Sequence, residues 1–142
     1  MSKYQYSTEL KENMCKAVGL DMPISSKTSV EICNKIRGMK LEKALVYLNQ
    51  VIELKQAVPF RRFTNIPHQV ATGPGRFPMK ASNHIHKILK AAEANAQFKG
   101  LSVNNLIIKH ISAQKGSKTI RYGRRRTQTK RTNIEVVLEE KK

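Results

Sequence analysis

A segment of unusual charge, residues 115–133, constrains this chain more than any other part of its sequence. It carries eight Lys or Arg residues and no Asp or Glu, so repulsion between like charges opposes packing it against itself. An alternating run follows at once, in which apolar residues alternate with Glu135 and Glu139. Such alternation predicts a strand with one buried face. The fold must therefore connect a segment that repels itself to a strand of the hydrophobic core.

A second β-like run, residues 101–113, precedes the basic segment. If the two runs pair as antiparallel strands, with Leu106 opposite Leu138 and Ile108 opposite Val136, the turn falls near Gly123. Each strand would contain roughly 15 residues and extend about 50 Å, whereas a domain of this length has a radius of gyration of about 14–15 Å. The far part of the hairpin, about 115–131, must therefore project. An isolated two-stranded ribbon is marginally stable, so we expect this part to be mobile alone and ordered in a negatively charged environment.

The net charge of +17 is concentrated in one half of the chain. Residues 54–134 contain 17 Lys or Arg and a single acid, Glu93, whereas the remaining residues contain 10 basic and 9 acidic side chains. A surface that serves only solubility mixes both signs. This half is therefore expected to bind a polyanion, for which nucleic acid is the usual candidate. A solvated basic face is the alternative interpretation.

Three helices are predicted by the spacing of apolar residues and by terminal signals. The first begins with a capping box in which Thr28 is the N-cap and Glu31 reaches back, and it ends at Gly38. The second runs from about 40 to 54. The third has Pro78 in its first turn and ends before Gly100.

The remaining amino-terminal segment gives weaker signals. Residues 1–17 are polar and show no pattern, and residues 18–24 form at most a short strand, because Gly19 and Pro23 disfavour one. The elements together predict an α+β fold and one domain over residues 1–142. Its compact part would comprise about 15–114 and 132–140, and the projecting arm about 115–131.

A loop of roughly twenty residues, 58–80, separates the second and third helices and contains four of the five prolines. Loops of this length in compact domains are usually functional or disordered. Basic and aromatic residues are interleaved in it: Arg61, Arg62, Arg76 and Lys80 with Phe60, Phe63 and Phe77. This mixture suits RNA, because guanidinium groups bind phosphates and rings stack on exposed bases. Alternatively, each Phe ring simply attaches the loop to the core.

Catalysis is not expected, nor are a metal or another cofactor. Metal-dependent nucleases and phosphoryl-transfer enzymes need clustered carboxylates, and the four His residues do not form a ligand set. Cys15 and Cys33 lack the spacing of a zinc site, and we expect reduced, partly buried thiols of a cytosolic protein, with a disulfide as the alternative. No apolar run is long enough for membrane insertion. No homo-oligomer is expected.

A basic DNA-binding or chromatin-compacting protein is the competing hypothesis. The third helix carries Lys80, Asn83, Lys87, Lys90 and Asn95, which is a weak match to a helix that reads a groove. No tandem helix-turn-helix spacing flanks it. A hairpin of about 50 Å also exceeds the depth of any groove, whereas a folded RNA with internal channels accommodates it.

Six stretches carry a family resemblance: IRGMKLEKALVYLNQVI, KQAVPFRRF, GRFPMKAS, AEANAQFKGL, HISAQKG and IEVVLEE. Together they resemble the large-subunit ribosomal protein family numbered twenty-two in bacteria and seventeen in eukaryotes, from about residue 15 to residue 140. KQAVPFRRF followed by GRFP is similar to the insertion of the archaeal and eukaryotic cytosolic branch. HISAQKG is similar to archaeal members.

The resemblance implies a β-α-α-α-β-β arrangement, with three helices against a small antiparallel sheet and a long protruding basic hairpin. It implies a cytoplasmic protein of the large ribosomal subunit, located near the peptide exit, that supports subunit assembly. Its partners would be large-subunit rRNA, neighbouring ribosomal proteins and the nascent polypeptide, because the hairpin, here 105–138, lines part of the exit tunnel in the family. This hairpin is a few residues shorter than usual, which leaves open whether its tip reaches the tunnel constriction.

The candidate RNA-binding residues fall into three groups. The resemblance adds two candidates from the first helix, Lys27 and Arg37. The loop supplies Arg61, Arg62, Arg76 and Lys80. The hairpin supplies Lys115, Lys118, Arg121, Arg124, Arg125, Arg126, Lys130 and Arg131. Tyr122 is expected to stack on a base or to face the tunnel. The predicted tunnel-lining tip is formed by Arg121, Tyr122, Gly123, Arg124, Arg125 and Arg126.

Overall fold

The computed structural model describes residues 4–70, 72–124 and 127–141. Its elements are, in order, β1 (Met14–Met22), α1 (Ser26–Ile36), α2 (Leu41–Ile52), β2 (Val58–Pro59), β3 (His68–Gln69), β4 (Gly73–Arg76), α3 (Met79–Phe98), the 3-10 turn η1 (Val103–Asn105), β5 (Leu106–Lys115) and β6 (Thr132–Glu140). The predicted α+β class is confirmed. The short strands β2, β3 and β4 were not predicted, and they organise the segment that was expected to be a plain loop.

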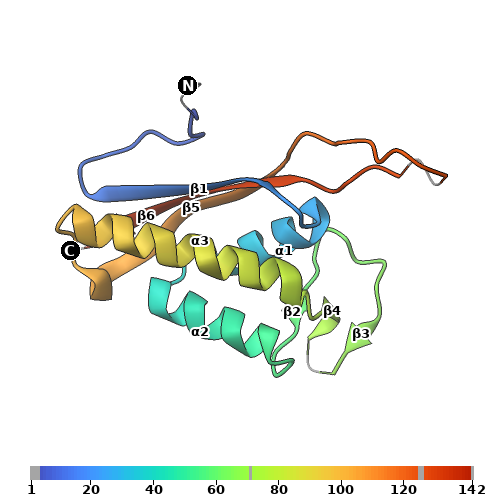
Figure 1. Cartoon of the computed structure of the whole chain (residues 1–142). Helices are drawn as coiled ribbons and strands as arrows, with labels where there is room; N and C mark the ends of the chain where they lie inside the picture. The colour runs from blue at the N-terminus through green and yellow to red at the C-terminus, as the bar shows by residue number, and fades with distance from the viewer. Residues whose placement is uncertain (1–3, 71, 125–126, 142) are drawn as a thin grey trace.

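The main sheet has the antiparallel order β1-β6-β5, so β6 is its central strand. Helices α3 and α1 cover one face of this sheet, and α2 packs on α3 (Figure 1). Fully buried apolar side chains from the sheet and from all three helices form a single core, which includes Ile36, Leu48, Leu89, Ile108 and Leu138. Burial of this apolar surface is the main force that stabilises the body.

The outer edge of β5 is paired with the turn between α1 and α2. The Gly38 N–H donates to the Ile108 carbonyl at 2.9 Å, and the Ile108 N–H donates to the Met39 carbonyl at 3.0 Å. Gly38 has a φ of +80°, which favours glycine. This pairing protects a sheet edge that would otherwise be open to association.

The predicted hairpin register is wrong by two residues at the body end. Leu106 lies opposite Glu140 and Ile108 opposite Leu138, and a bulge between Ile108 and His110 then shifts the pairing further. A register shift of two residues cannot be read from alternation, because it keeps the same side chains on the core face. The bulge places Ile108 and Ile111, three residues apart, on the same buried face. The turn consequently moves toward the carboxyl side of residue 122 and still includes Gly123, whose φ is +129°.

The prediction that Glu135 lies on an exposed face of β6 is also wrong, because its side chain is only 1% exposed. The amino-terminal segment covers this face, and Tyr4 and Ser7 donate hydrogen bonds to the carboxylate. Ser112 donates another at 2.9 Å, and His110 lies 2.8 Å away. Burial alone would raise the pKa of Glu135, but these hydrogen bonds lower the pKa to about 2. The outer face of the sheet is thus built around an ionised acid.

The start of α1 differs from the predicted capping box. Ser25 is the N-cap, and Thr28 lies inside the helix, where its hydroxyl donates to the Ser25 carbonyl at 3.0 Å. Glu31 does not reach back to the helix terminus but binds a distant segment. The end of the helix near Gly38 is as predicted, and α2 is shorter than predicted by a residue or two at each end.

Strand β1 is longer than predicted and begins at Met14, inside the segment that showed no pattern. Gly19 does not end it, although the pairing of β1 with β6 shifts register between Gly19 and Met22. A Cβ at this position would lie 2.6 Å from Ile88 Cδ1, so the glycine lets α3 approach the strand closely. The start of α3 also differs from the prediction, because Pro78 is its N-cap rather than a residue of its first turn. Gly100 follows the end of this helix with a φ of +77°.

Candidate nucleic-acid interface

The arm, defined as residues 115–131, projects beyond the helices and the sheet (Figure 1). A sparse ladder joins its two sides: an isolated bridge pairs Ile120 with Gln128, and the N–H groups of Arg121 and Thr129 donate to carbonyls across the arm at 2.9 Å. The arm contains no acidic residue. It has no neutralising charge of its own, so its cations are available to an anionic partner.

Most of the predicted arm residues present their side chains to solvent. Those that are exposed are Lys115, Lys118, Arg121, Arg124 and Lys130, whereas Arg131 is half-buried. Tyr122 has 101% of its surface exposed, so its ring is accessible to a partner. Arg125 and Arg126 lie outside the described residues.

The root of the arm is fixed to the body. Arg131 Nη1 donates to the Asp21 carbonyl at 3.0 Å, and the Asp21 N–H donates to Asn133 Oδ1 at 2.8 Å. The Gly116 N–H donates to the Arg131 carbonyl at 2.9 Å. A Cβ on Gly116 would lie 2.7 Å from Asp21 Oδ1, so glycine lets the two segments meet without displacing that side chain. The arm is therefore aimed by its root although its far part has few contacts.

A buried acid holds the basic loop, defined as residues 58–78. The side chain of Glu31 is 1% exposed. Its carboxylate accepts hydrogen bonds from the consecutive N–H groups of Arg61, Arg62 and Phe63 at 3.1, 2.8 and 2.8 Å. The two arginine side chains point to solvent. Glu31 thus fixes the backbone from which both guanidinium groups extend.

The loop aromatics divide between the two roles considered for them. Phe60 is 4% exposed and belongs to the core. Phe63 is half-buried, and two cations lie over its ring, Lys27 Nζ at 5.5 Å and Arg62 Cζ at 5.6 Å from the centroid. The structure therefore brings Lys27, Arg62 and Phe63 into one cluster, although Phe63 follows Lys27 by 36 positions in the sequence.

Two further predicted residues flank the loop. Arg76 is exposed at the end of β4, where it pairs with Val58. Lys80 lies in the first turn of α3 and not in the loop, and it is exposed there. It lines the same cleft as Lys130 of the arm. The loop, the start of α3 and the arm thus contribute cations to neighbouring surfaces.

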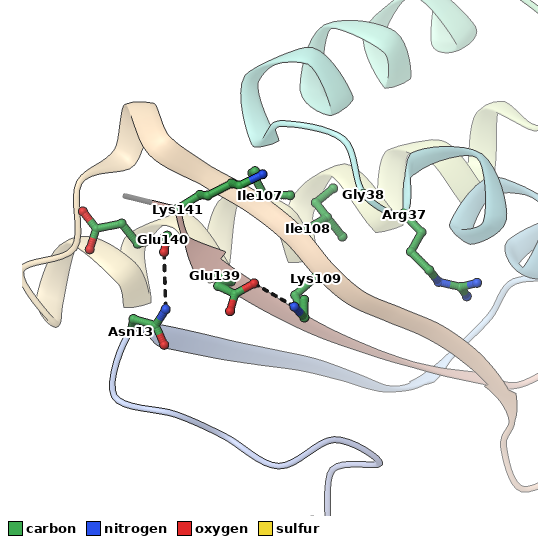
Figure 2. A pocket seen from close by; sticks show the side chains of 9 residues that line it. All are labelled: Asn13, Arg37, Gly38, Ile107, Ile108, Lys109, Glu139, Glu140 and Lys141. Carbon is green, nitrogen blue, oxygen red and sulfur yellow. Dashed lines mark hydrogen bonds and ion pairs between the residues drawn. The ribbon is translucent and has the colours of Figure 1, made fainter.

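Arg37 has a structural role that the sequence did not indicate. Its Nη2 donates to the Ile111 carbonyl at 2.9 Å and so supports the edge of β5. Arg37 also lines a cleft of about 650 Å³ next to the start of β5 and the end of β6, shown in Figure 2. The cleft contains both signs of charge, including an ion pair of 3.0 Å between Lys109 and Glu139. This mixture distinguishes it from the acid-free surface of the arm.

Two residues of the interface were missed from sequence. Glu31 was interpreted as a helix cap, because a single acid gives no sign of the distant amides that it binds. Lys35 was not singled out, yet it lines a cleft with Arg61 and lies over the Tyr47 ring at 5.8 Å. Helical spacing alone places Lys35 one turn after Glu31, which is the signal that could have found it.

The thiols and the His residues do not extend the interface into a reactive site. Cys15 and Cys33 are free and fully buried, more so than expected. Burial raises the pKa of Cys33 to about 12 and also raises the pKa of Cys15, so both thiols are weak nucleophiles. Within residues 4–70, 72–124 and 127–141, no group of three or more His, Cys, Asp or Glu side chains is placed to hold a metal ion. The described helices include none that is both long and apolar enough to cross a membrane.

Comparisons with known proteins match one family over most of the chain. A family model described as Ribosomal protein L22p/L17e matches residues 17–139. The chain is 44% identical to the large ribosomal subunit protein uL22 of Methanococcus aeolicus, over 99% of each chain. It is 45% identical to the protein of the same name from Archaeoglobus fulgidus, over 84% of this chain and 79% of the relative. The corresponding protein of Methanothrix thermoacetophila is 42% identical over 82% of this chain and 79% of the relative.

Proposed function

Because this chain belongs to the ribosomal protein L22p/L17e family, in its archaeal form, we propose that it is a structural component of the large ribosomal subunit. In this role it works in the cytoplasm and binds the RNA of that subunit through the arm and the basic loop. The relatives are named as ribosomal proteins, and the family is structural rather than enzymatic. Neighbouring ribosomal proteins are its other partners within the particle.

One observation carries the RNA-binding part of this proposal. The arm presents exposed cations on both of its sides, contains no acid and projects away from the body. Phosphates would neutralise it, and each neutralised phosphate releases counterions to the solvent. An arm that projects has room for RNA around it, whereas a basic patch on a flat face contacts nucleic acid from one direction only.

The finer proposal concerns the tip of the arm. The tip would line the nascent-peptide tunnel, which the family resemblance supports, and residues 121–124 form the described part of the tip here. Tyr122, which is fully exposed, is the side chain best suited to contact a passing polypeptide or a base. A photo-reactive amino acid at position 122 should crosslink to a stalled nascent chain in purified ribosomes. The same probe at Thr8, on the amino-terminal segment, is the matched control and should not.

Sedimentation and salt dependence test the main proposal. The protein in a lysate should migrate with large subunits, and binding of the purified protein to a large-subunit RNA transcript should fall steeply between about 50 and 200 mM salt. Migration with the chromosome instead, or equal affinity for duplex DNA of the same length, would support the chromatin hypothesis. A flat salt response would exclude the arm cations as phosphate ligands.

A further inference from the structure

A cleft of about 410 Å³ lies where the root of the arm meets the starts of α1 and α3. Its volume is within the range of clefts that hold small ligands. Three separate segments line it: residues 23–28, residues 78–81 and Lys130. We call it the arm-root cleft. It joins the arm to the body, so a ligand in it would contact both.

The lining of the arm-root cleft combines an apolar floor with a cationic rim. Pro23, Ile24 and Pro78 contribute apolar surface, and Met79 keeps 48% of its surface exposed. Lys80 and Lys130, both exposed, add charges from two different segments, and no acidic residue in the described part of the chain lines the cleft. Neither α1 nor α3 has an acid in its first turn, so the positive ends of both helix dipoles add to the same sign.

The walls of the cleft are held in place by hydrogen bonds at the arm root. The buried hydroxyl of Thr132 donates to the Ile24 carbonyl at 2.8 Å, which ties the floor to the strand that follows Lys130. The guanidinium group of Arg131 donates a hydrogen bond to the Asp21 carbonyl at 3.0 Å. Lys130 therefore extends from a fixed backbone, and the cleft exists before a ligand arrives.

We propose that the arm-root cleft binds one unpaired nucleotide of the RNA. The base lies against the floor around Met79, and the phosphates on either side of it are bound by Lys80 and Lys130. This inference rests on the proposed RNA-binding function and makes it specific. A nucleotide is the occupant because it combines a flat, weakly polar face with two adjacent anions, whereas a paired base keeps its faces stacked inside the duplex. The site anchors the RNA strand at the point where the arm leaves the body.

Binding to a single-stranded probe tests the cleft directly. The full-length protein is titrated with a fluorescent eight-nucleotide oligouridylate, and with an RNA duplex of the same length. Lys80→Gln with Lys130→Gln should weaken binding of the oligouridylate about tenfold, and Met79→Glu should do the same, because stacking and paired phosphate contacts are lost together. Lys87→Gln with Lys90→Gln is the matched control. It removes the same charge from exposed positions of α3 and should change affinity at most about twofold.

A second readout locates the nucleotide. With 4-thiouridine in the probe, crosslinks should fall in the peptides that contain Pro23–Thr28 or Met79. All the substituted side chains are exposed, so unchanged melting temperatures are expected and verify that the variants fold. Equal weakening by the control pair, or crosslinks confined to the arm, would overturn the cleft proposal.

The failure of this inference can be distinguished from the failure of the proposed function. If the wild-type protein binds a large-subunit RNA transcript while the cleft variants behave like the control, the cleft is wrong and the function stands. If the wild-type protein does not bind that transcript, the proposed function itself fails. Tight binding of the transcript with specific loss in the cleft variants supports both.

Discussion

The arm and the basic loop are two cationic segments that the same chain holds in opposite ways. The loop is fixed from behind, because the carboxylate of Glu31 accepts three consecutive backbone N–H groups at residues 61–63. The far part of the arm has no such anchor among the described residues, and its cross-strand ladder is sparse. The protein's own contacts hold one segment, whereas the other would be ordered by the RNA ligand proposed for it.

The difference shows how a buried acidic residue can stabilise the backbone of a basic surface. An acid in front of an RNA-binding surface would repel phosphate, but Glu31 lies beneath the surface and acts on backbone amides. The loop therefore loses little conformational entropy when it binds, whereas ordering the arm costs part of the free energy that its phosphate contacts supply. In the proposed function, the loop would fix where the protein sits on the RNA, and the arm would extend its reach.

The largest expected effect comes from breaking the loop anchor. Glu31→Ala leaves three partly buried N–H groups without their acceptor, so the free energy of unfolding should fall by about 3 kcal/mol in urea titrations of the free protein. Hydrogen exchange should accelerate at the amides of residues 61–63 and stay unchanged in the arm. Glu31→Gln keeps one acceptor oxygen, so its free energy of unfolding should lie between those of the wild type and Glu31→Ala.

The matched control is Glu42→Ala, which removes an exposed acid from α2 and should change stability by no more than about 0.5 kcal/mol. If Glu31→Ala lowered the free energy of unfolding no more than this control does, the anchor would not be Glu31. The loop would then be held by the short strands β2, β3 and β4.

A second buried acid extends the comparison to the outer face of the sheet, where Glu135 holds the amino-terminal segment. Its pKa is lowered to about 2 from the usual 4.5, so its ionised form stabilises the fold. This contribution is complete above about pH 4.5 and is lost as the pH falls toward 2. It amounts to about 3 kcal/mol. Unfolding measured between pH 5 and pH 2.5 should show a smaller loss of stability for Glu135→Gln than for the wild type. Glu12→Gln, at an exposed position, should follow the wild type.

Shortening the arm separates binding from folding. Replacing residues 118–129 by Asn-Gly, which suits a two-residue hairpin turn, removes five basic residues and keeps the root contacts of Arg131 and Gly116. The free energy of unfolding should change by no more than about 0.5 kcal/mol, whereas affinity for a large-subunit RNA transcript should fall about 100-fold at low salt. Large-subunit assembly should be impaired. An unfolded product would mean that the arm belongs to the core.

The fold could largely be predicted from sequence where periodicity is local. The three helices, the two hairpin strands and the projection of the arm follow from spacing, charge and chain length. The register and the burial of Glu135 could not be predicted, because both depend on partners distant in sequence. A bulge near Lys109 and a cover that begins at Tyr4 leave no mark on the alternation of β6.

The sequence was sufficient to predict which segments of the candidate interface are basic, but not which of their residues meet in space. The excess of cations and the absence of acids identified the arm and the loop, since charge is additive along the chain. Sequence could not show that Lys27 meets Phe63, that Lys80 shares a cleft with Lys130, or that Arg37 supports a strand edge. Each of these depends on how helices and strands cross in three dimensions.

The smallest expected effect concerns the boundary between the ordered body and the arm. In Gly116→Ala the new methyl group would lie 2.7 Å from Asp21 Oδ1 and 3.1 Å from Asn133 Oδ1. The nearest atom is the end of an exposed side chain that can move, so the loss of stability should be modest, about 1 kcal/mol. Hydrogen exchange at the Asp21 amide should accelerate, because its bond to Asn133 is disturbed. Ser117→Ala, next to it on the exposed side of the arm, should leave both measurements unchanged. If Gly116→Ala also leaves them unchanged, the root does not aim the arm, and its direction is set by RNA alone.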